Sequence, residues 1–453
     1  MRKFTFFSMF CLVGFLCLQC SSAPEIQPVY SEKWPEIKAY IQRSWPDYVE
    51  VDPVMPKPYL YGLNPGTFYY WDVYFHNEGL MRCGYWDIAQ GNLDCMIFEI
   101  DSLGFIPTAL HWGTNRSQLP FFSHSVRRYY EMNPVKDKEW LMTAYRAVLK
   151  EYEFWTNENG NFIEDHTTPI AGLQRYSHHA DSAELISFYD RVLFYRIPGV
   201  SREDPIEQKL DVADQMMAET ECQDFTPRFG GRIKNFIPIC LNSYLVGYEN
   251  DLAFYEKELG ISPTRDWKKI ADNRAALIEK YCWSEERGFY MDYDFVNDRH
   301  SPVASMAGIM PLFFNFAPKN HAKRVRDNLP LFDSDGGLVS SEVFPGGEAY
   351  QYGYTAVWPN VQQLAIESLE NYGFRKETRN IAMKWLNTAT RNWVDPQPKT
   401  YPPFKYGDGT RHPGFLYEKY TRDGNINDTE YPCSHMLGWA GTVFLVALET
   451  VEK

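Results

Sequence analysis

The sequence predicts a mainly α protein that forms one large domain. Apolar residues recur at helical spacing in about a dozen successive segments. Only short pieces, such as residues 288–294, have the character of strands, and no β-α-β alternation is found. The sequence contains no linker or low-complexity segment and no phosphate-binding glycine motif. These observations favour a helical domain with a large core over a nucleotide-binding α/β fold.

The predicted helices follow one another with long loops between them. A proline-rich stretch over residues 21–58 contains one amphipathic helix, 32–44, and an aromatic block with its own helix follows. Residues 159–177 carry glycine and proline and are expected to form a loop. The remaining helices are expected at 87–103, 121–132, 137–157, 206–218, 239–259, 266–281, 301–313, 319–328, 359–372, 376–393 and 437–451.

Residues 1–20 have the pattern of an export signal. Arg2 and Lys3 precede an apolar run that is too short to span a bilayer. Its end, LCLQCSS, resembles a relaxed bacterial lipobox, which would place a lipid on Cys20; the alternative is an ordinary signal peptide with a chance cysteine. We expect an exported protein that a lipid anchors to a bacterial membrane, facing the periplasm or the cell surface, with residues 21–58 as a lead-in and 59–453 as the main domain.

Composition excludes some classes of partner. The net charge of −14 argues against nucleic acids, and the aromatic content of 16% suits a protein that handles carbohydrates. No cofactor is expected, and no metal, because none of the six cysteines after Cys20 belongs to a CxxC pair and histidines do not cluster at zinc spacing. The six cysteines after Cys20 are expected mainly as buried thiols, although Cys83–Cys95 or Cys222–Cys240 could bridge in an oxidising compartment.

An aromatic block is the feature around which the chain is organised. Residues 64–75 read NPGTFYYWDVYF, with six aromatics in the last eight positions and Asp72 among them. Aromatic faces stack on sugar rings, and a carboxylate or an arginine binds hydroxyl groups. The structural alternative is a buried helix start that Asp72 caps. Two further motifs follow, GFIP at 104–107 and NRSQLP at 115–120.

Together these motifs resemble the sugar-binding segments of trehalases and of glucosidase I-like glycoside hydrolases. The resemblance covers most of residues 60–445 in motif order, although Thr67 stands where trehalases carry an arginine after two glycines. It implies an (α/α)6 toroid, in which six helical hairpins form a closed ring and long loops at one end build the site. It also implies hydrolysis of an α-linked disaccharide or oligosaccharide, such as a glucoside, a trehalose-like sugar or a mannosyl substrate, with inversion.

Glycoside hydrolysis needs an acid and a base, and the resemblance assigns both. Asp224 lies in AETECQDFTPRF, which is similar to the trehalase segment that carries the general acid. The neighbouring apolar FIPI run could raise its pKa. The local pattern alone favours Asp224 as the cap of a turn, and the flanking matches put the acid role ahead. Glu418, in FLYEKY, matches the position of the base, and Glu430 is its rival. Inversion predicts carboxyl groups about 6.5–9.5 Å apart.

The resemblance also implies a set of sugar-binding residues. Arginines suit this role because the guanidinium group is always charged and forks onto paired oxygens, whereas a surface ion pair is the ordinary fate of any one arginine. Glu430 is assigned here to binding rather than to catalysis. The expected residues are Phe68, Tyr70, Trp71, Asp72, Asn115, Arg116, Gln118, Arg175, Arg232, Trp358, Glu430 and Trp439.

Two alternative functions remain open from the sequence. Gln223, Cys240 and Gly353 stand where trehalases carry other residues, so the same barrel could be a catalytically inactive carbohydrate-binding protein. A sugar epimerase or uronide hydrolase would instead use histidines as proton carriers, and His178 and His179 are the one adjacent pair.

Overall fold

The computed structural model describes residues 26–453 apart from 64, 159–162, 198, 403–410 and 430. The leader with Cys20, and also Glu430, therefore lie outside the described residues. No helix in the described part of the chain combines the length and the apolar character that crossing a membrane requires.

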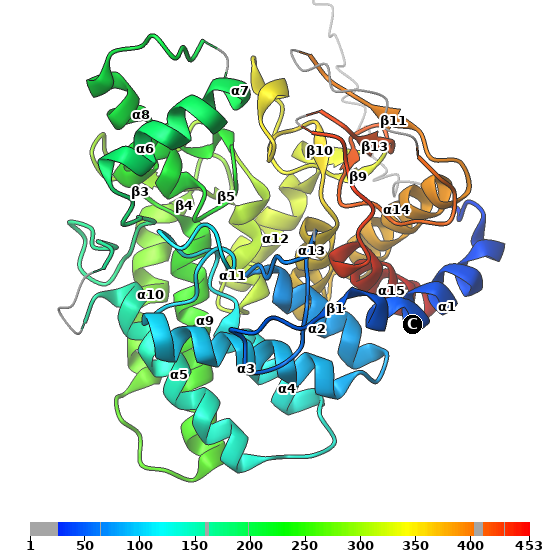
Figure 1. Cartoon of the computed structure of the whole chain (residues 1–453), viewed down its shortest axis with the longest axis horizontal. Coiled ribbons are helices and arrows are strands. Elements are labelled where there is room, and N and C mark those ends of the chain that lie inside the picture. Colours follow the sequence, from blue (N-terminus) through cyan, green and yellow to red (C-terminus); the bar gives the residue numbers. More distant parts are fainter. Residues whose placement is uncertain (1–25, 64, 159–162, 198, 403–410, 430) are drawn as a thin grey trace, which may run out of the picture.

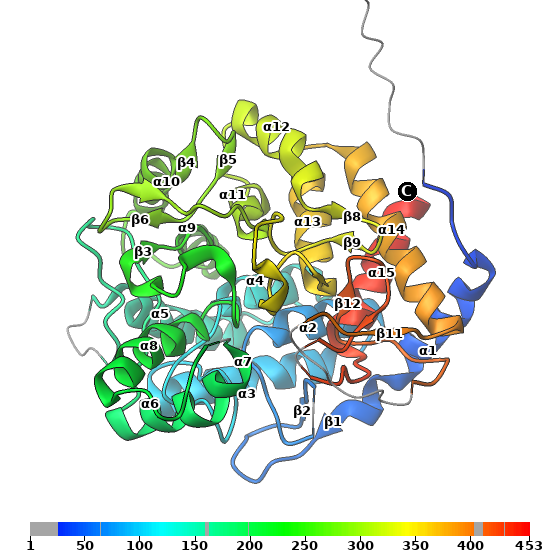
Figure 2. The ribbon, with the colours of Figure 1, turned by 90° about the horizontal axis from the view of Figure 1, so that it is seen from above.

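Helices that contact one another in sequence order form a closed inner ring. Each inner helix contacts the next one, and the last contacts the first, so the ring has no free edge. Figure 2 looks down on this ring from the side on which the long loops gather. In the described part of the chain its members are α2 (Asp72–Arg82), α4 (Phe122–Met132), α9 (Ile239–Leu259), α11 (Met310–Phe313), α13 (Pro359–Asn371) and α15 (Gly438–Glu452).

A second helix alternates with each inner helix along the chain and lies outside the ring (Figure 1). For example, α5 packs on α4 and α9, and α14 packs on α13 and α15. This alternation confirms the mainly α fold and the (α/α)6 toroid. The outer helices are α1 (Trp34–Ser44), α3 (Trp86–Leu103), α5 (Lys138–Thr156), α10 (Trp267–Cys282), α12 (Lys319–Asn328) and α14 (Arg375–Val394).

The inner helices are buried on nearly every side. Ten of the eleven residues of α2 are buried, from Asp72 to Met81, so this helix shows little of the one-sided pattern of a surface helix. The buried apolar side chains of the ring join into one continuous core. A helix enclosed by its neighbours in this way is a rigid support for the loops at its ends.

Two predicted elements differ in the structure. The expected helix 301–313 is helical only from Met306, as the 3-10 turn Met306–Ile309 followed by α11. Residues 301–305 are not helical, since Ser301 donates its backbone N–H to the backbone oxygen of Asp292 and Ser305 bridges to Ser341. The expected strand 288–294 is two strands, β5 (Phe289–Tyr290) and β6 (Tyr293–Asp294), which belong to different sheets.

Helices that the sequence did not indicate lie between α5 and α9. They are α6 (Ser182–Phe188), the π-helical turn Tyr189–Leu193 and α7 (Phe194–Arg196), and they pack with α8 (Ile206–Glu219) around a small apolar cluster of their own. The start of α6 carries a capping box between Asp181 and Glu184. This group of helices, residues 182–219, sits on the loop side of the ring (Figure 1).

Short strands tie the loops together. β10 (Ala356–Val357) pairs with β12 (Tyr420–Thr421), so the segment before α15 lies beside the start of α13. β12 continues to β13 (Ile426–Asn427), which pairs with β11 (Pro398–Lys399). The other strands are β1 (Val49–Glu50), β2 (Tyr59–Leu60), β3 (Phe236–Ile237), β4 (Trp283–Ser284), β7 (Arg299–His300), β8 (Asp333–Ser334) and β9 (Gly337–Leu338).

Candidate active site

A pocket of about 510 Å³ opens on the loop side of the ring, and we call it the loop-side pocket. Its walls come from the segments before α2, α4, α9, α13 and α15, and from the ends of α6 and α7. The amino-terminal ends of the inner helices therefore point toward it, and their dipoles favour negative charge there. Asp72, Asp224 and Glu418 all line this pocket.

Asp224 lies in a tight turn after α8. Phe225, the next residue, has φ of 53°, a left-handed conformation that a bulky side chain adopts only when its surroundings hold it. The buried carboxylate of Glu219 accepts the backbone N–H of Thr226 at 2.9 Å and so braces this turn. Burial raises the pKa of Asp224, and the positive charges of Arg116 and Arg196 partly oppose that rise. A raised pKa keeps a carboxyl group protonated, as a general acid requires.

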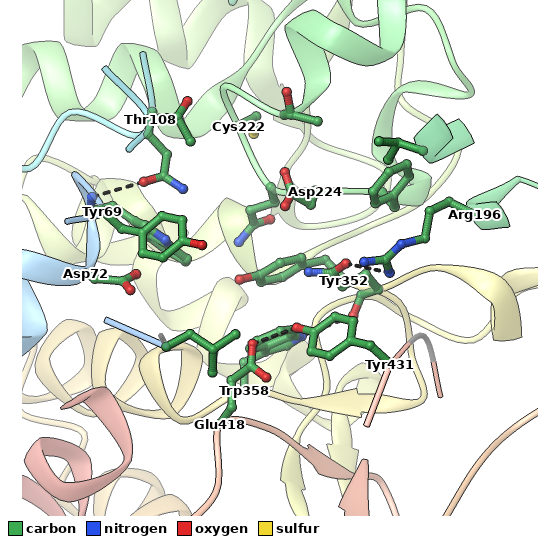
Figure 3. Close-up of a pocket in the computed structure, with 18 of the residues that line it drawn as sticks. Tyr69, Asp72, Thr108, Arg196, Cys222, Asp224, Tyr352, Trp358, Glu418 and Tyr431 are labelled. Carbon is green, nitrogen blue, oxygen red and sulfur yellow. Dashed lines mark hydrogen bonds between the residues drawn. The ribbon is translucent and has the colours of Figure 1, made fainter. Parts of the chain in front are cut away.

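Glu418 reaches the pocket from the segment before β12, on the opposite side from Asp224 (Figure 3). Its side chain is only 4% exposed. The Tyr431 hydroxyl donates a hydrogen bond to Glu418 Oε1 at 2.6 Å. Trp439 Nε1 donates to the backbone oxygen of Glu418 at 2.9 Å, which fixes the chain at this residue. These contacts hold the carboxylate in one orientation toward the pocket.

A third carboxyl group, that of Asp72, lies at the start of α2. Burial raises its pKa well above the usual range, and the negative charge of Glu418 adds to the rise. Burial raises the pKa of the Tyr352 hydroxyl well above the usual range, and the negative charges of Asp224, Asp72 and Glu418 add to the rise. Tyr352 therefore lies among the three acids, as Figure 3 shows.

Aromatic rings form the walls of the pocket. Tyr352 stacks on Trp358 with ring centroids 4.5 Å apart and planes within 5°. Trp439 meets Trp358 and Trp71 edge to face, at 5.7 Å and 5.9 Å. Tyr69 and the half-exposed Trp112 pack edge to face nearer the mouth. Such walls suit the apolar faces of a sugar ring, while the acids face its hydroxyl groups.

Two arginines line the pocket, and only one of them was expected. Arg116 is buried, and its Nη1 donates to Asn115 Oδ1 at 2.8 Å. Arg196, at the end of α7, donates to Gln351 Oε1 at 3.1 Å (Figure 3). Its guanidinium group lies 5.2 Å from the ring centres of both Phe225 and Tyr431. Arg196 thus connects helices 182–219 to the loops that carry both acids.

Six of the eleven described binding candidates line the pocket. Trp71, Asp72, Arg116, Gln118, Trp358 and Trp439 line it, and Gln118 Oε1 accepts the backbone N–H of Trp71 at 3.2 Å. Glu430 is outside the described residues. The other expected residues do not line the pocket: Phe68, Tyr70, Asn115, Arg175 and Arg232.

The residues away from the pocket have other partners. Tyr70 is in the core, where its hydroxyl contacts Glu151 and Tyr248. Phe68 packs on Tyr59 in the core.

The two arginines away from the pocket form ion pairs. Arg175 binds Asp165, and Arg232 is half exposed and binds Asp211. This is the ordinary role of an arginine, and neither side chain is among those that line the loop-side pocket.

Several lining residues escaped the sequence reasoning, among them Arg196, Tyr352, Tyr431, Gln351 and Tyr69. Arg196 lies in the helices that the periodicity did not indicate, so no motif pointed to it. A capping box at Asp181 is the one local signal that could have revealed this segment.

A buried acidic cluster behind the pocket comes nearest to a metal-binding arrangement among the described residues. Glu164, His166 and Glu221 each bring a potential ligand atom within 4.8 Å of the others. Glu221 already accepts the backbone N–H groups of Ser117 and Ser177, at 3.2 and 2.7 Å. Its pKa is raised well above the usual range by burial and by the charge of Glu164. We interpret the cluster as a set of hydrogen bonds that holds together the loop with Ser117 and the loop with Ser177.

Comparison with known proteins agrees with this geometry. The Trehalase family model matches residues 50–452. The cytosolic neutral trehalase of Kluyveromyces lactis is 28% identical over 434 residues, which cover 85% of this chain but only 55% of that protein. A periplasmic trehalase of Escherichia coli is 26% identical, covering 92% of this chain and 73% of that protein. The chain thus spans about half to three quarters of the length of these relatives.

Solved structures show the same fold. The neutral trehalase of Saccharomyces cerevisiae superposes with a TM-score of 0.68 at 24% identity, over 91% of this chain and 79% of that one. A GH63 mannosylglycerate hydrolase from Thermus thermophilus superposes with a TM-score of 0.60 at 16% identity, over 91% and 99%. With a family model that spans nearly the whole chain, the protein belongs to the trehalase family of glycoside hydrolases.

Proposed function

We propose that the protein is an inverting α-glycosidase in which Asp224 is the general acid and Glu418 the general base. The observation that carries the proposal is the placement of these two carboxyl groups on opposite sides of one aromatic-walled pocket (Figure 3). Their surroundings differ in the way that the two roles require. Burial raises the pKa of Asp224, whereas Glu418 accepts a hydrogen bond from Tyr431.

The reaction follows from these positions. Asp224 donates its proton to the glycosidic oxygen as the bond to the leaving group breaks. Glu418 takes a proton from a water molecule that attacks the anomeric carbon from the other face of the ring. Tyr431 keeps the Glu418 carboxylate directed at that water. The third acid, Asp72, and the donors of Arg116 lie where they can bind sugar hydroxyl groups.

The substrate class is an α-linked disaccharide or short oligosaccharide. The pocket volume of about 510 Å³ lies within the range of small-molecule sites. Its relatives are named trehalases, and one structural neighbour is named a mannosylglycerate hydrolase. We therefore place a glucoside first and a mannoside second. Within the described residues no histidine lines the pocket, so the site gives little support to a histidine-dependent epimerase or uronide hydrolase.

We further propose that the protein is exported and held on a bacterial membrane by a lipid on Cys20, with residues 59–453 as the catalytic domain. The basic and apolar leader supports export, and one relative is named a periplasmic trehalase. A Cys20→Ala variant should move from the membrane fraction to the soluble periplasmic fraction, whereas an unchanged membrane fraction would rule out this anchor.

A substrate panel tests the proposed activity. The purified protein is incubated with trehalose, other α-glucosides and α-mannosides, and released glucose and mannose are measured. We expect turnover of at least one α-glucoside and none of the β-linked counterparts. Binding of sugars without turnover anywhere in the panel would instead support a carbohydrate-binding protein, the reading that Gln223, Cys240 and Gly353 motivate.

A further inference from the structure

Two buried cysteines face each other beside the turn that carries Asp224. The sulfur atoms of Cys222 and Cys240 are 3.8 Å apart, and each side chain is 2% exposed. Cys222 lies two residues before Asp224, and Cys240 lies in the first turn of α9. Neither forms a disulfide in the structure. The pair therefore spans the loop with the proposed acid and a rigid helix of the inner ring.

A single arginine binds both sulfurs. Arg228 is fully buried and donates from Nη1 to Cys222 Sγ at 3.3 Å and from Nη2 to Cys240 Sγ at 3.2 Å. Asp292 fixes this guanidinium group with hydrogen bonds of 2.9 and 2.6 Å. A cation held against two sulfurs favours the thiolate form, which is the form that reacts with oxidants.

The two cysteines differ in charge state. Burial by itself would raise the pKa of Cys240, but the hydrogen bond from Cys222 and the charge of Arg228 outweigh it and lower this pKa to about 6. Burial raises the pKa of Cys222 well above the usual range. A thiolate thus lies next to a thiol, which is the arrangement of a reactive and a resolving cysteine.

Small oxidants can reach the pair through the loop-side pocket. Cys222 is one of the lining residues of the pocket. Cys240 lines a small adjoining cavity, and Trp71 and Gln223 border both spaces. Cys95 differs from this pair because it is fully buried in α3, where its thiol donates to the backbone oxygen of Lys57.

We propose that Cys222 and Cys240 are a redox-active pair whose disulfide switches off the neighbouring active site. With hydrogen peroxide as oxidant, the Cys240 thiolate attacks one oxygen, the O–O bond breaks, and a sulfenic acid and hydroxide form. The Cys222 sulfur then attacks the sulfenic sulfur, the S–S bond forms, and the hydroxyl group leaves as water with the proton of Cys222. The two cysteines lose two electrons, and the peroxide gains them.

The disulfide changes the geometry around Asp224. A disulfide bond is about 2.05 Å long, so the sulfurs must approach one another and Arg228 loses its thiolate acceptor. Because α9 is packed into the ring, the turn with Cys222 and Asp224 is the part that moves. Misplacement of a catalytic group by about 1 Å can cost about a hundredfold in rate. We expect at least about a tenfold loss of activity in the oxidised protein.

The test uses the full-length protein, first reduced with dithiothreitol and then treated with hydrogen peroxide. Peptide mapping by mass spectrometry should find a cross-linked peptide pair containing Cys222 and Cys240, lighter by two hydrogen atoms. Activity should fall and should return on renewed reduction. Cys95→Ser, a matched control, should behave like the unmodified protein. Cys222→Ser and Cys240→Ser, each compared with its own untreated sample, should keep their activity after peroxide.

Two results would overturn the inference. One is the absence of the Cys222–Cys240 cross-link after complete peroxide treatment, which needs no variant and no active enzyme to observe. The other is an equal loss of activity in Cys222→Ser, Cys240→Ser and the unmodified protein. The activity measurement rests on the proposed glycosidase function, whereas the mapping does not. A failure of the proposed function would appear as absent activity before any oxidation, so the two failures can be told apart.

Discussion

The ring has a cavity at each end, and the two are built from opposite ends of the same helices. The loop-side pocket lies at the amino-terminal ends, and a second cavity of about 440 Å³, which we call the opposite cavity, is lined by their carboxyl-terminal parts. Three acids and two arginines line the first, whereas the second is lined by five acids together with Arg82, Arg127, Arg128 and Lys453.

The two cavities differ in how their charges are neutralised. In the opposite cavity Arg82 and Arg128 both bind Glu78, and Arg127 binds Asp251. In the loop-side pocket Asp72 and Asp224 form no ion pair with any described residue. The charges of the opposite cavity are neutralised within the protein, whereas carboxyl groups that face a pocket without an ion pair are available to a substrate. Both ends carry ionisable groups, and this difference in pairing is the reason for proposing the loop-side pocket as the site of chemistry.

The largest effect is expected on loss of either proposed catalytic group. Asp224→Asn and Glu418→Gln should each lower kcat by about 10²–10⁴-fold, because general acid and base catalysis contribute that much. Steady-state kinetics on the substrate found in the panel measures the loss. Melting temperatures should stay close to that of the unmodified protein, since Asp224 forms no ion pair with a described residue.

A matched change at the other end serves as the control. Glu131→Gln makes the same carboxyl-to-amide change beside the opposite cavity, where Glu131 pairs with Arg127 at a partly exposed position. It should leave kcat within about twofold, since a surface ion pair contributes only about 0–1 kcal/mol to stability. Full activity of Asp224→Asn would mean that a carboxyl-to-amide change affects kcat no more in the loop-side pocket than beside the opposite cavity.

Glu78→Gln should have the opposite effect to the catalytic variants: it should lower the free energy of unfolding and leave kcat nearly unchanged. It leaves two partly buried arginines without their shared carboxylate, which costs about 3–5 kcal/mol. Burial opposes ionisation of Glu78, but Arg128 and Arg82 lower its pKa from 4.5 to about 2. Its stabilisation is thus present above pH 4.5 and is lost as the pH falls through 2. Urea titration at neutral pH should show the loss, and an unchanged midpoint would contradict the structural role.

Arg196→Gln should change the pH profile of activity. Burial raises the pKa of Asp224, and Arg196 partly lowers it, so removal of Arg196 should raise that pKa further. The proposed acid then stays protonated to higher pH, and the alkaline limb of kcat/KM should move to higher pH. The value of kcat/KM at its optimum should fall by about 10- to 100-fold, since a hydrogen bond to a charged group is worth about 1.5–3 kcal/mol. An alkaline limb at unchanged pH would mean that Arg196 does not influence the pKa of Asp224.

The smallest effect concerns Glu219, which braces the turn after Asp224. Burial raises its pKa from 4.5 to about 8, so its favourable neutral state is fully present below pH 4.5 and is lost as the pH rises through 8. Glu219→Gln stays neutral and keeps an oxygen that can accept the Thr226 N–H. Relative to the variant, the unmodified protein should lose stability as the pH rises from about 4.5 to about 8, and the difference in melting temperature should stay constant above pH 8. Parallel curves throughout would mean that Glu219 is not a buried neutral acid.

The sequence was most informative where local pattern and motif order coincide. Helical periodicity found the inner and outer helices other than α11 to within a few residues, because each helix buries its apolar side chains against a neighbour. It missed α6 and α7, which are short and are interrupted by a π-helical turn. The surrounding motifs pointed to the pocket acids Asp224 and Glu418. The sequence did not show in which direction each side chain points, so Arg175 and Arg232 were expected in a pocket that Arg196 lines instead. That choice depends on tertiary packing, which a single sequence does not display.

Proton NMR of the first product tests the central claim most directly. The enzyme is mixed with its α-linked substrate, and anomeric signals are recorded before mutarotation equilibrates the sugars. If Asp224 and Glu418 act from opposite faces of the ring, the sugar that is attacked appears first as the β-anomer. An α-anomer from that ring would show retention and would contradict the assignment of Glu418 as a base that activates water.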